Sequence, residues 1–310
     1  MAVRPERSRS ATGRGVSSEA DLWSSRARTR RDRTRPGKIE ARRRESGSND
    51  SLAGGGEGRT TLSAHMNSDE YLKLAEVEDR MWYFPSLHWH VRRGLERGGL
   101  ADAADVLDAG CGTGGLVLRL RTQRPAWRWT GIDFSALGVE LARRRVPGVT
   151  FEEASITALP QGDATFDAVV SADVICQVDN PAVALAEFFR VLRPGGIVAI
   201  NVPAYMWMWS YHDDSCQTKR RYTRPELAGL LRGAGFEDVR TTHWNALPFP
   251  LLWAKRKIFR TAQDTSDVKP YPAVLEAGFN AAMALEHAWV RAGGRWAWGS
   301  SVFATARKPK

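Results

Sequence analysis

A glycine-rich run that follows a short apolar stretch is the part of this 310-residue sequence best suited to bind a ligand. Residues 106–109 are typical of a buried strand, and Gly110, Gly112 and Gly114 follow at the start of a predicted helix. Glycine is needed where a backbone turns sharply and approaches a ligand closely. The free N–H groups at a helix start favour an anionic group. The run therefore predicts a site for a nucleotide-like ligand.

The spacing of these glycines leaves more than one class of cofactor open. Gly110, Gly112 and Gly115 form a G-x-G-x-x-G pattern, so a nicotinamide or flavin oxidoreductase is one interpretation. Asp133 lies 21 positions after Gly112, at the end of the next predicted strand, where a carboxylate can bind both hydroxyls of a ribose. Asp108 stands at a strand end where a dinucleotide fold usually has an apolar residue, which argues against the oxidoreductase.

Four separate segments carry a resemblance to a known family. Residues 104–203 resemble a class I S-adenosylmethionine-dependent methyltransferase of the small-molecule type. The matching motifs are the run 108–114 (DAGCGTG), Asp133, the pair Leu159-Pro160 followed by 166–170 (FDAVV), and the turn 193–196 (RPGG). The resemblance implies S-adenosylmethionine as cofactor and methyl transfer to a small-molecule or lipid/glycan-intermediate acceptor.

The same resemblance implies which residues hold the cofactor. The glycines would line its methionine part, Asp133 would bind its ribose, and Phe134 would lie against its adenine. The family often has an acidic residue five positions before the proline of Leu159-Pro160; Ser155 stands there instead, which predicts a weaker contact with the adenine amino group. The expected cofactor-binding residues are Asp108, Gly110, Cys111, Gly112, Gly114, Asp133, Phe134, Ser155, Ala172 and Asp173.

Alternating strands and helices must position these residues. Strands are expected at 106–109, 127–132, 150–151, 166–171, 196–202, 239–242 and 301–306, with helices at 114–121, 136–145, 181–192 and 224–234. This alternation predicts an α/β fold with a doubly wound, mainly parallel sheet, which the resemblance extends to seven strands in a Rossmann-like methyltransferase fold. Further helices are expected in an N-terminal part (from 68, and at 86–95) and a C-terminal insertion (248–261 and 272–291).

An aromatic and polar segment follows the fifth predicted strand and should lie above the cofactor. A wider likeness, over most of 70–308, to an uncharacterised branch of the family adds the upstream run 82–84 (WYF), the run 220–222 (RRY) and Asn245. The residues expected to contact the acceptor are Trp82, Tyr83, Tyr205, Arg220, Arg221, Tyr222 and Asn245.

His212 and Asp213 are the expected catalytic pair. The donor is already activated, so the enzyme mainly supplies alignment, and a base helps only if the acceptor must lose a proton. His212 would be that base, oriented by Asp213; alternatively, His212 only hydrogen-bonds its own loop. Arg220 and Arg221 would bind a phosphate or carboxylate of the acceptor, or pair with nearby acids and brace the loop.

Most of the net charge of +10 lies in the N-terminal tail. Residues 1–65 hold 15 Lys and Arg against 8 Asp and Glu, whereas residues 66–310 have a net charge of only +3. The tail is interpreted as disordered, with a nucleic-acid arm and a transit peptide as alternatives. Met66 begins the run MNSDEYLKL and is a candidate alternative start, which leaves 66–310 as the methyltransferase domain.

Two other functions were weighed against small-molecule methyl transfer. An RNA methyltransferase using the basic arm is disfavoured because 66–310 is nearly neutral and nucleic-acid binding requires phosphate neutralisation. A catalytically silent binding module of the same fold is opposed by the intact glycine turn and Asp133, although Ser155 leaves it open. The oligomeric state and the acceptor atom are not predicted.

Cysteine usage and apolar patterning indicate a cytoplasmic protein. Three cysteines with no metal-ligand spacing argue against a disulfide framework and a metal site, and no apolar run approaches the ~20 residues of a membrane span. Segments 66–99, 204–223 and 246–298 are expected to form lids on the substrate side. Residues 246–260 mix apolar and basic side chains, which predicts either an interfacial helix at a membrane surface or a lid helix packed on the sheet.

Overall fold

The computed structural model describes residues 68–259 and 266–310. These residues belong to one compact unit, Thr60–Lys310. The predicted basic tail 1–65 and the candidate start at Met66 lie outside the described residues. Within the described ranges, no helix is long and apolar enough to cross a membrane.

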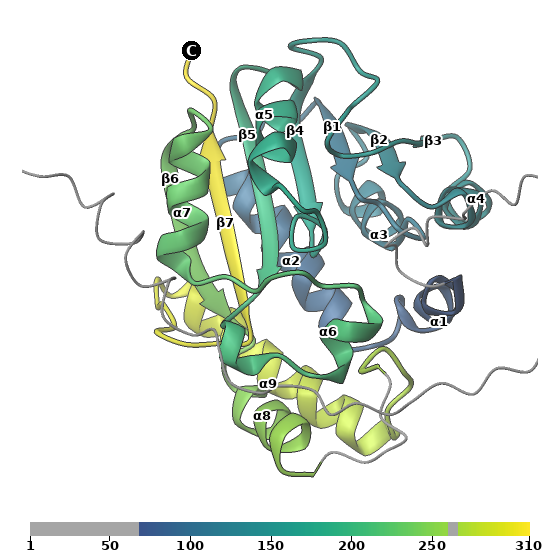
Figure 1. Ribbon diagram of the computed structural model, residues 1–310, viewed down its shortest axis with the longest axis vertical. Helices are drawn as coiled ribbons and strands as arrows, with labels where there is room; N and C mark the ends of the chain where they lie inside the picture. Colours follow the sequence, from purple (N-terminus) through teal and green to yellow (C-terminus); the bar gives the residue numbers. More distant parts are fainter. Residues whose placement is uncertain (1–67, 260–265) are drawn as a thin grey trace, which may run out of the picture. The chain divides into compact units, whose positions relative to one another are not determined.

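The centre of the fold is a seven-stranded sheet in the order β3-β2-β1-β4-β5-β7-β6 (Figure 1). Five strands pair in parallel, and β7 runs antiparallel between β5 and β6. The predicted seven-stranded, mainly parallel sheet is therefore confirmed. The strands are β1 (Ala104–Ala109), β2 (Trp127–Asp133), β3 (Thr150–Glu153), β4 (Phe166–Ala172), β5 (Leu192–Pro203), β6 (Glu237–Trp244) and β7 (Ser301–Arg307).

Helices cover both faces of this sheet, as the doubly wound prediction requires. Successive strand residues point to opposite faces, so Val106 joins one buried cluster and Leu107 the other. The first cluster includes side chains of α2 (Tyr83–Arg97), α3 (Gly115–Gln123) and α4 (Ala136–Arg145). The second includes side chains of α5 (Pro181–Val191) and α7 (Arg224–Gly233), which Figure 1 shows in front of the sheet.

The remaining helices gather beyond the carboxyl ends of the parallel strands (Figure 1). They are α1 (Ser68–Val77), α6 (Tyr211–Ser215), α8 (Phe249–Lys257) and α9 (Ala273–Arg291), together with the short 3-10 helix η2 (Met206–Met208). The sequence predicted a plain polar loop where η2 and α6 form. A capping box accounts for α6, because Ser210 and Asp213 satisfy each other's backbone N–H groups.

The strand order reverses at β1, whose neighbours are β2 on one side and β4 on the other. The connections from β1 and from β4 therefore leave toward opposite faces of the sheet. Open α/β sheets bind ligands in the crevice formed at such a point, outside the carboxyl ends of the strands. A ligand site is therefore expected at the turns that follow β1, β2 and β4.

Candidate active site

The turn after β1 needs glycine for two physical reasons. Gly110 and Gly112 have φ values of +95° and +53°, a backbone region that side-chain-bearing residues rarely adopt. In addition, a Cβ on Gly110 would lie 2.2 Å from a methyl carbon of Val174. The turn after β1 is therefore pressed against the segment after β4, which brings the two strand ends into one site.

Gly114 has a different task from the one predicted. It also has a positive φ, of +80°, but a Cβ there would lie 3.1 Å from the Cβ of Ala142 in α4. It does not line the cavity described below. The expectation that Gly114 contacts the cofactor is corrected: this glycine lets α3 and α4 approach each other.

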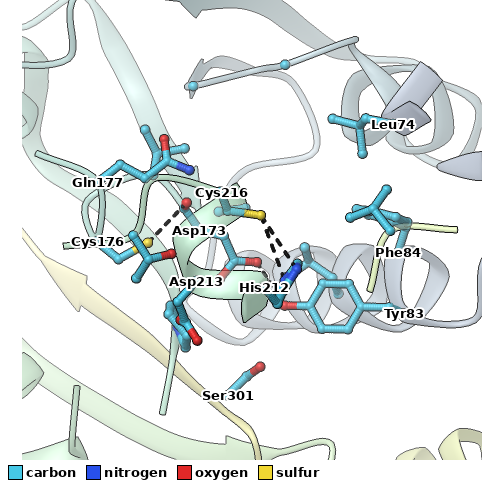
Figure 2. A pocket seen from close by; sticks show the side chains of 18 of the residues that line it. Leu74, Tyr83, Phe84, Asp173, Cys176, Gln177, His212, Asp213, Cys216 and Ser301 are labelled. Carbon is cyan, nitrogen blue, oxygen red and sulfur yellow. Dashed lines mark hydrogen bonds between the residues drawn. The ribbon is translucent and has the colours of Figure 1, made fainter. Parts of the chain in front are cut away.

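A cavity of about 670 Å³ lies at the carboxyl ends of these strands (Figure 2). Its size falls within the range of ligand sites, 300–1,000 Å³. It is lined by segments far apart in the sequence, from α1 to the start of β7. Nine of the predicted cofactor residues line it: Asp108, Gly110, Cys111, Gly112, Asp133, Phe134, Ser155, Ala172 and Asp173.

Asp108 presents an unsatisfied carboxyl oxygen at this site. The residue is 2% exposed, and its Oδ2 atom has no hydrogen-bond partner among the described residues. Burial, followed by the nearby charges of Glu78 and Asp133, raises the pKa of Asp108 to about 8. A buried acceptor without a partner costs free energy unless a ligand supplies a donor. The amino group of an amino-acid moiety would fit here.

Asp133 ends β2 as a carboxylate held by several donors. The Tyr71 hydroxyl donates to Oδ1 at 2.7 Å, the Ser135 N–H donates to the same oxygen at 2.9 Å, and the Gly112 N–H donates to Oδ2 at 2.8 Å. Burial raises the pKa of Asp133, and these donors oppose that rise. The Phe134 N–H also hydrogen-bonds this carboxylate, so ribose hydroxyls bound here would share or replace part of this set of donors.

Phe134 and Ser155 lie where an adenine ring would be expected. Phe134 lines the cavity and is 50% exposed, so its ring offers an apolar face to a ligand. The Ser155 hydroxyl lies 2.7 Å from Thr157 Oγ1 and accepts a hydrogen bond from the Thr157 N–H at 3.2 Å. The Ser155 side chain thus stabilises its own turn.

The sequence suggested that the start of α3 offers its N–H groups to a ligand, but in the structure it does not. A Cβ on Gly115 would lie 2.1 Å from the carboxyl carbon of Glu78, so this side chain of the chain itself covers the helix start. Thr113 Oγ1 and Arg145 also hydrogen-bond Glu78 Oε2, at 2.5 and 2.7 Å. The favourable position for an anion is therefore taken by Glu78.

The other end of the cavity contains a hydrogen-bonded network around Asp173. The Tyr83 hydroxyl donates to Asp173 Oδ2 at 2.8 Å, and Asn201 Nδ2 donates to Oδ1 at 2.9 Å. Trp244 Nε1 in turn donates to Asn201 Oδ1 at 2.7 Å, and the Trp244 ring stacks on Tyr83. Burial raises the pKa of Asp173, which follows β4 with a positive φ of +60°.

His212 and Asp213 do not form the predicted pair. Asp213 accepts hydrogen bonds from Arg221 Nε at 2.7 Å and from the Ser210 N–H at 2.9 Å. His212 Nδ1 instead accepts from the Asp267 N–H at 3.3 Å. Burial lowers the pKa of His212 to about 4. The neutral ring therefore carries its proton on Nε2, and Cys216 Sγ lies 3.9 Å from that nitrogen, so His212 is not arranged as a base.

The predicted acceptor-binding residues separate into two groups. Trp82, Tyr83, Arg221 and Asn245 line the cavity. Trp82 Nε1 and Asn245 Oδ1 are buried without a hydrogen-bond partner among the residues described.

The second group lies outside the cavity lining and stabilises the surrounding loops. The Tyr205 hydroxyl lies 3.1 Å from His243 Nε2. Arg220 donates to the carbonyl of Asp179, and the Tyr222 hydroxyl donates to the carbonyl of Ile175 at 3.3 Å. The bracing interpretation thus describes Arg220, while Arg221 both pairs with an acid and faces the cavity.

Sequence reasoning missed several residues of the site. Tyr71, Glu78, Arg256 and Asp267 line the cavity but lie in segments that were predicted only as helix or lid. Asn201 lies inside β5, where the only signal is a polar residue within an apolar strand. No group of three or more His, Cys, Asp or Glu that could hold a metal ion occurs in 68–259 and 266–310.

Comparison with known proteins supports the assignment of this site. Residues 107–200 match the family described as methyltransferase domain. A protein of Mycolicibacterium smegmatis named a probable S-adenosylmethionine-dependent methyltransferase is 36% identical over 136 residues, which are 43% of this chain and 52% of that protein. The trans-aconitate 2-methyltransferase of Azoarcus sp. is 30% identical over 178 residues, 57% of this chain and 64% of that enzyme. The chain thus spans about half to two thirds of the length of these relatives.

Among solved structures, the [4+2]-cyclase SpnF shares the fold, with a TM-score of 0.53 and 23% identity over 78% of this chain and 92% of that one. A fold shared at this level does not fix a reaction. The specific match is the sequence family over the very residues that build β1, the glycine turn, Asp133 and β4. Residues 107–200 therefore form a methyltransferase domain of the class I S-adenosylmethionine-dependent type, with S-adenosylmethionine as its cofactor.

Proposed function

We propose that this protein transfers the methyl group of S-adenosylmethionine to a small-molecule acceptor. The observation that supports this most directly is one continuous cavity that joins two chemically different ends. One end carries Asp108, Asp133 and Phe134, and the other carries Asp173, His212 and Arg221. A cofactor bound at the first end would place its reactive part toward the second.

The residues present fit the cofactor group by group. Asp108 Oδ2 lacks a donor, the Asp133 carboxylate lines the cavity at the end of β2, and Phe134 offers an exposed ring. When bound, the cofactor supplies an activated methyl group on a sulfonium centre. The contribution of the chain is to hold the two reactants in line and to keep water out, which is the main source of rate in such a displacement.

The acceptor is proposed to be a polar small molecule with at least one hydrogen-bond donor. Asn245 is 2% exposed, Asn245 Nδ2 donates to Ser300 Oγ at 2.7 Å, and its Oδ1 atom has no partner. Arg221 lines the same end and can hydrogen-bond an anionic group while it stays paired with Asp213.

Isothermal titration calorimetry with S-adenosylmethionine and S-adenosylhomocysteine tests the cofactor half of this proposal. Both nucleosides are expected to bind, and Asp133→Ala is expected to weaken binding by about 10- to 100-fold, because hydrogen bonds to a charged group are lost. Asp102→Ala is the matched control, since Asp102 is fully exposed and does not line the cavity. Equal affinity in all three proteins would contradict the site.

Labelled methyl donor added to a soluble metabolite extract tests the transfer half. Label is expected in a small-molecule fraction. The comparisons support neither the RNA methyltransferase nor the silent binding module weighed from the sequence. Label recovered in RNA would favour the first, and nucleoside binding without any transfer would favour the second.

A membrane-surface contact through residues 246–260 is proposed as an addition. On α8 and just beyond it, Leu251, Trp253, Ile258 and Phe259 are 40–70% exposed, while Leu252 on the same helix lines the cavity. Residues 246–259 contain three cations and no acid; Lys255 and Arg256 pair with Asp267, so Lys257 is the exposed cation of α8. Amphipathic helices with such aromatic and basic residues bind anionic lipid surfaces.

Vesicles of phosphatidylcholine with 30% phosphatidylserine would test this contact by co-sedimentation. Binding is expected, and it should fall in a Leu251→Glu/Ile258→Glu variant. Vesicles of phosphatidylcholine alone carry no net charge, so binding to them measures the apolar contact without the electrostatic attraction. The absence of pelleted protein on the anionic vesicles would refute the contact and leave α8 as a lid helix.

A further inference from the structure

We infer that Asp173 is the general base of the reaction and that the acceptor therefore carries a hydroxyl group. This inference rests on the proposed methyl transfer and adds to it the identity of the base and the class of acceptor. The expectation from sequence was that His212 would be the base and that Asp173 would touch the cofactor.

The position of Asp173 places it beside the reacting atoms. It follows β4 directly, and its neighbour Val174 presses on Gly110 in the turn that holds the cofactor. Asp173 lines the cavity, and Figure 2 shows its carboxylate in the same region as Tyr83 and His212. The Asp173 carboxylate therefore belongs to the acceptor end of the cavity, while its neighbour Val174 contacts the turn of the cofactor end.

The neighbours of Asp173 hydrogen-bond its carboxylate but leave acceptor positions open on it. Tyr83 donates to one oxygen and Asn201 to the other, so each oxygen keeps a further acceptor position. Asn201 is fixed in turn by Trp244. Tyr83, Asn201 and Trp244 are positioning residues in this arrangement, because they act through Asp173.

The backbone conformation of Asp173 is consistent with a functional position. Its φ of +60° is uncommon for a residue with a side chain, and strained residues of this kind gather at active sites. The strain is maintained by the backbone hydrogen bond from the Asp173 N–H to the Asn201 carbonyl at 2.9 Å. β4 and β5 thus fix both ends of the residue.

The competing base, His212, is poorly arranged for the task. Its Nδ1 lone pair accepts the Asp267 N–H, and Cys216 Sγ lies 3.9 Å from Nε2, so neither ring nitrogen presents a lone pair to an acceptor (Figure 2). Its pKa of about 4 also makes it a weak proton acceptor at neutral pH. Asp173 has the opposite character: burial raises its pKa, which brings a carboxylate closer to the operating pH.

The proton balance of the step selects a hydroxyl acceptor. The acceptor oxygen forms a bond to the methyl carbon while the carbon–sulfur bond breaks and its electron pair stays on sulfur. The hydroxyl proton moves to an Asp173 oxygen, which becomes a neutral carboxylic acid. The sulfonium charge and the carboxylate charge disappear together, so the buried site holds no new net charge. A carboxylate acceptor has no proton to lose, and a neutral amine attacks through its own lone pair and releases its proton only afterwards. A hydroxyl is therefore the acceptor that needs a base during the transfer itself.

The charged and titratable groups around Asp173 determine its pH behaviour. They are Tyr83 on α2, Cys176 after β4, Cys216 after α6, and Arg221 on the loop that follows. The thiols of Cys176 and Cys216 have raised pKa values because of burial and stay neutral, while Arg221 opposes the rise in the pKa of Asp173. Activity should therefore rise with pH as Asp173 ionises.

The test compares Asp173→Asn, Tyr83→Phe and His212→Ala with the unaltered protein, using labelled donor and a soluble metabolite extract between pH 5 and 9. Asp173→Asn is expected to lower transfer at least ~100-fold, which is the usual loss of a general base. Its affinity for S-adenosylhomocysteine should change less than ~3-fold, because the amide keeps the shape of the carboxylate. Exposed Asp163→Asn is the matched control.

Tyr83→Phe gives a readout that does not depend on activity. The hydrogen bond from Tyr83 lowers the pKa of Asp173, so its loss should raise that pKa in the cofactor-free protein. Carboxyl-carbon NMR measures this shift, and the acidic limb of the transfer profile should move in the same direction. This variant also keeps the inference testable if Asp173→Asn does not fold.

The possible failures are distinguishable. If the unaltered protein transfers no label, the proposed function itself fails. If it transfers label but Asp173→Asn keeps its rate, or His212→Ala alone loses it, Asp173 is not the base. If the labelled product carries its methyl group on nitrogen, carbon or a carboxylate, the hydroxyl assignment is overturned. An unshifted Asp173 pKa in Tyr83→Phe would refute the positioning role.

Discussion

The Tyr71 hydroxyl donates a 2.7 Å hydrogen bond to Asp133 Oδ1, and this bond joins the first described helix to the carboxylate at the end of β2. The two residues are 62 positions apart, and both are less than 8% exposed. A Cβ on Gly138 would lie 2.7 Å from the Tyr71 ring, so α1 also packs tightly on α4. The N-terminal segment is therefore part of the cofactor site.

Tyr71→Phe should destabilise the cofactor-free protein by about 1.5–3 kcal/mol, because a hydrogen bond to a buried charged group is lost. Urea unfolding followed by circular dichroism measures the change. Glu76→Gln at an exposed position of the same helix is the control and should cost less than about 0.5 kcal/mol. Equal effects of the two substitutions would show that the Tyr71–Asp133 bond does not form in solution.

Stability should depend on pH through Asp108. Its folded pKa of about 8 lies above its ordinary value of 3.8, so the folded state holds a proton that the unfolded state has released. The contribution of Asp108 to the free energy of unfolding should therefore fall as pH rises from 6.5 to 7.5, by up to about 1.4 kcal/mol per pH unit. Buried histidines such as His88 and His212 act in the opposite direction, because their lowered pKa values keep them neutral in the folded state while the unfolded state still binds protons near pH 6.5.

Asp108→Asn should remove this contribution. Urea unfolding of the cofactor-free protein at several pH values would show stability changing more positively with rising pH in the variant than in the unaltered protein, because only the opposing histidine contribution remains. Asp102→Asn, at a fully exposed position, should leave the dependence of the unaltered protein unchanged. The same pH dependence in Asp108→Asn and the unaltered protein would assign the proton to another carboxyl group.

Two glycine substitutions should separate backbone strain from steric overlap. Gly148 has a φ of +81° and open space around it, so Gly148→Ala should cost about 1–2 kcal/mol through strain alone. Gly110→Ala adds the 2.2 Å overlap with Val174 and should cost about 1–3 kcal/mol more. It should also abolish cofactor binding, as measured by calorimetry. Similar unfolding midpoints for the two variants would contradict the close approach.

Removing only one partner of the Arg221–Asp213 ion pair should strongly lower the free energy of unfolding. Both side chains are at most 2% exposed, so Asp213→Leu leaves a buried charge without a partner and should cost about 3–5 kcal/mol. Adding Arg221→Met should recover part of that loss. Arg144→Met, which breaks the exposed pair with Glu140, should cost less than about 1 kcal/mol.

Thermal unfolding of the single and double variants checks this prediction. The double variant should have the higher midpoint of the two Asp213 variants, although it lacks one more native interaction. If it is the less stable protein, then the two residues contribute independently and no stranded charge is involved.

The cofactor end of the site could be predicted from the sequence because its signal is local. Asp108, Gly110 and Gly112 lie within five residues of one another, and the strand before them fixes where they point. Asp133 was found the same way, because the carboxyl ends of neighbouring parallel strands meet at one edge of the sheet.

The acceptor end could not be predicted in this way, because its pairs join distant segments. Sequence adjacency suggested that Asp213 orients His212, yet consecutive residues on a helix do not face each other, and Asp213 points to Arg221 instead. Likewise, the sequence suggested an anion site at the helix start near Gly115, but in the folded protein the Glu78 side chain covers that position.

By itself, the sequence determined the doubly wound sheet, the glycine turn and the two carboxylates of the cofactor end, because strand periodicity and turn chemistry act over a few residues. Only the tertiary structure decided that Tyr83 meets Asp173 across 90 positions and that Gly114 packs helices. Such contacts depend on how α2 and the loops after β4 and β5 pack, and nothing local encodes that packing.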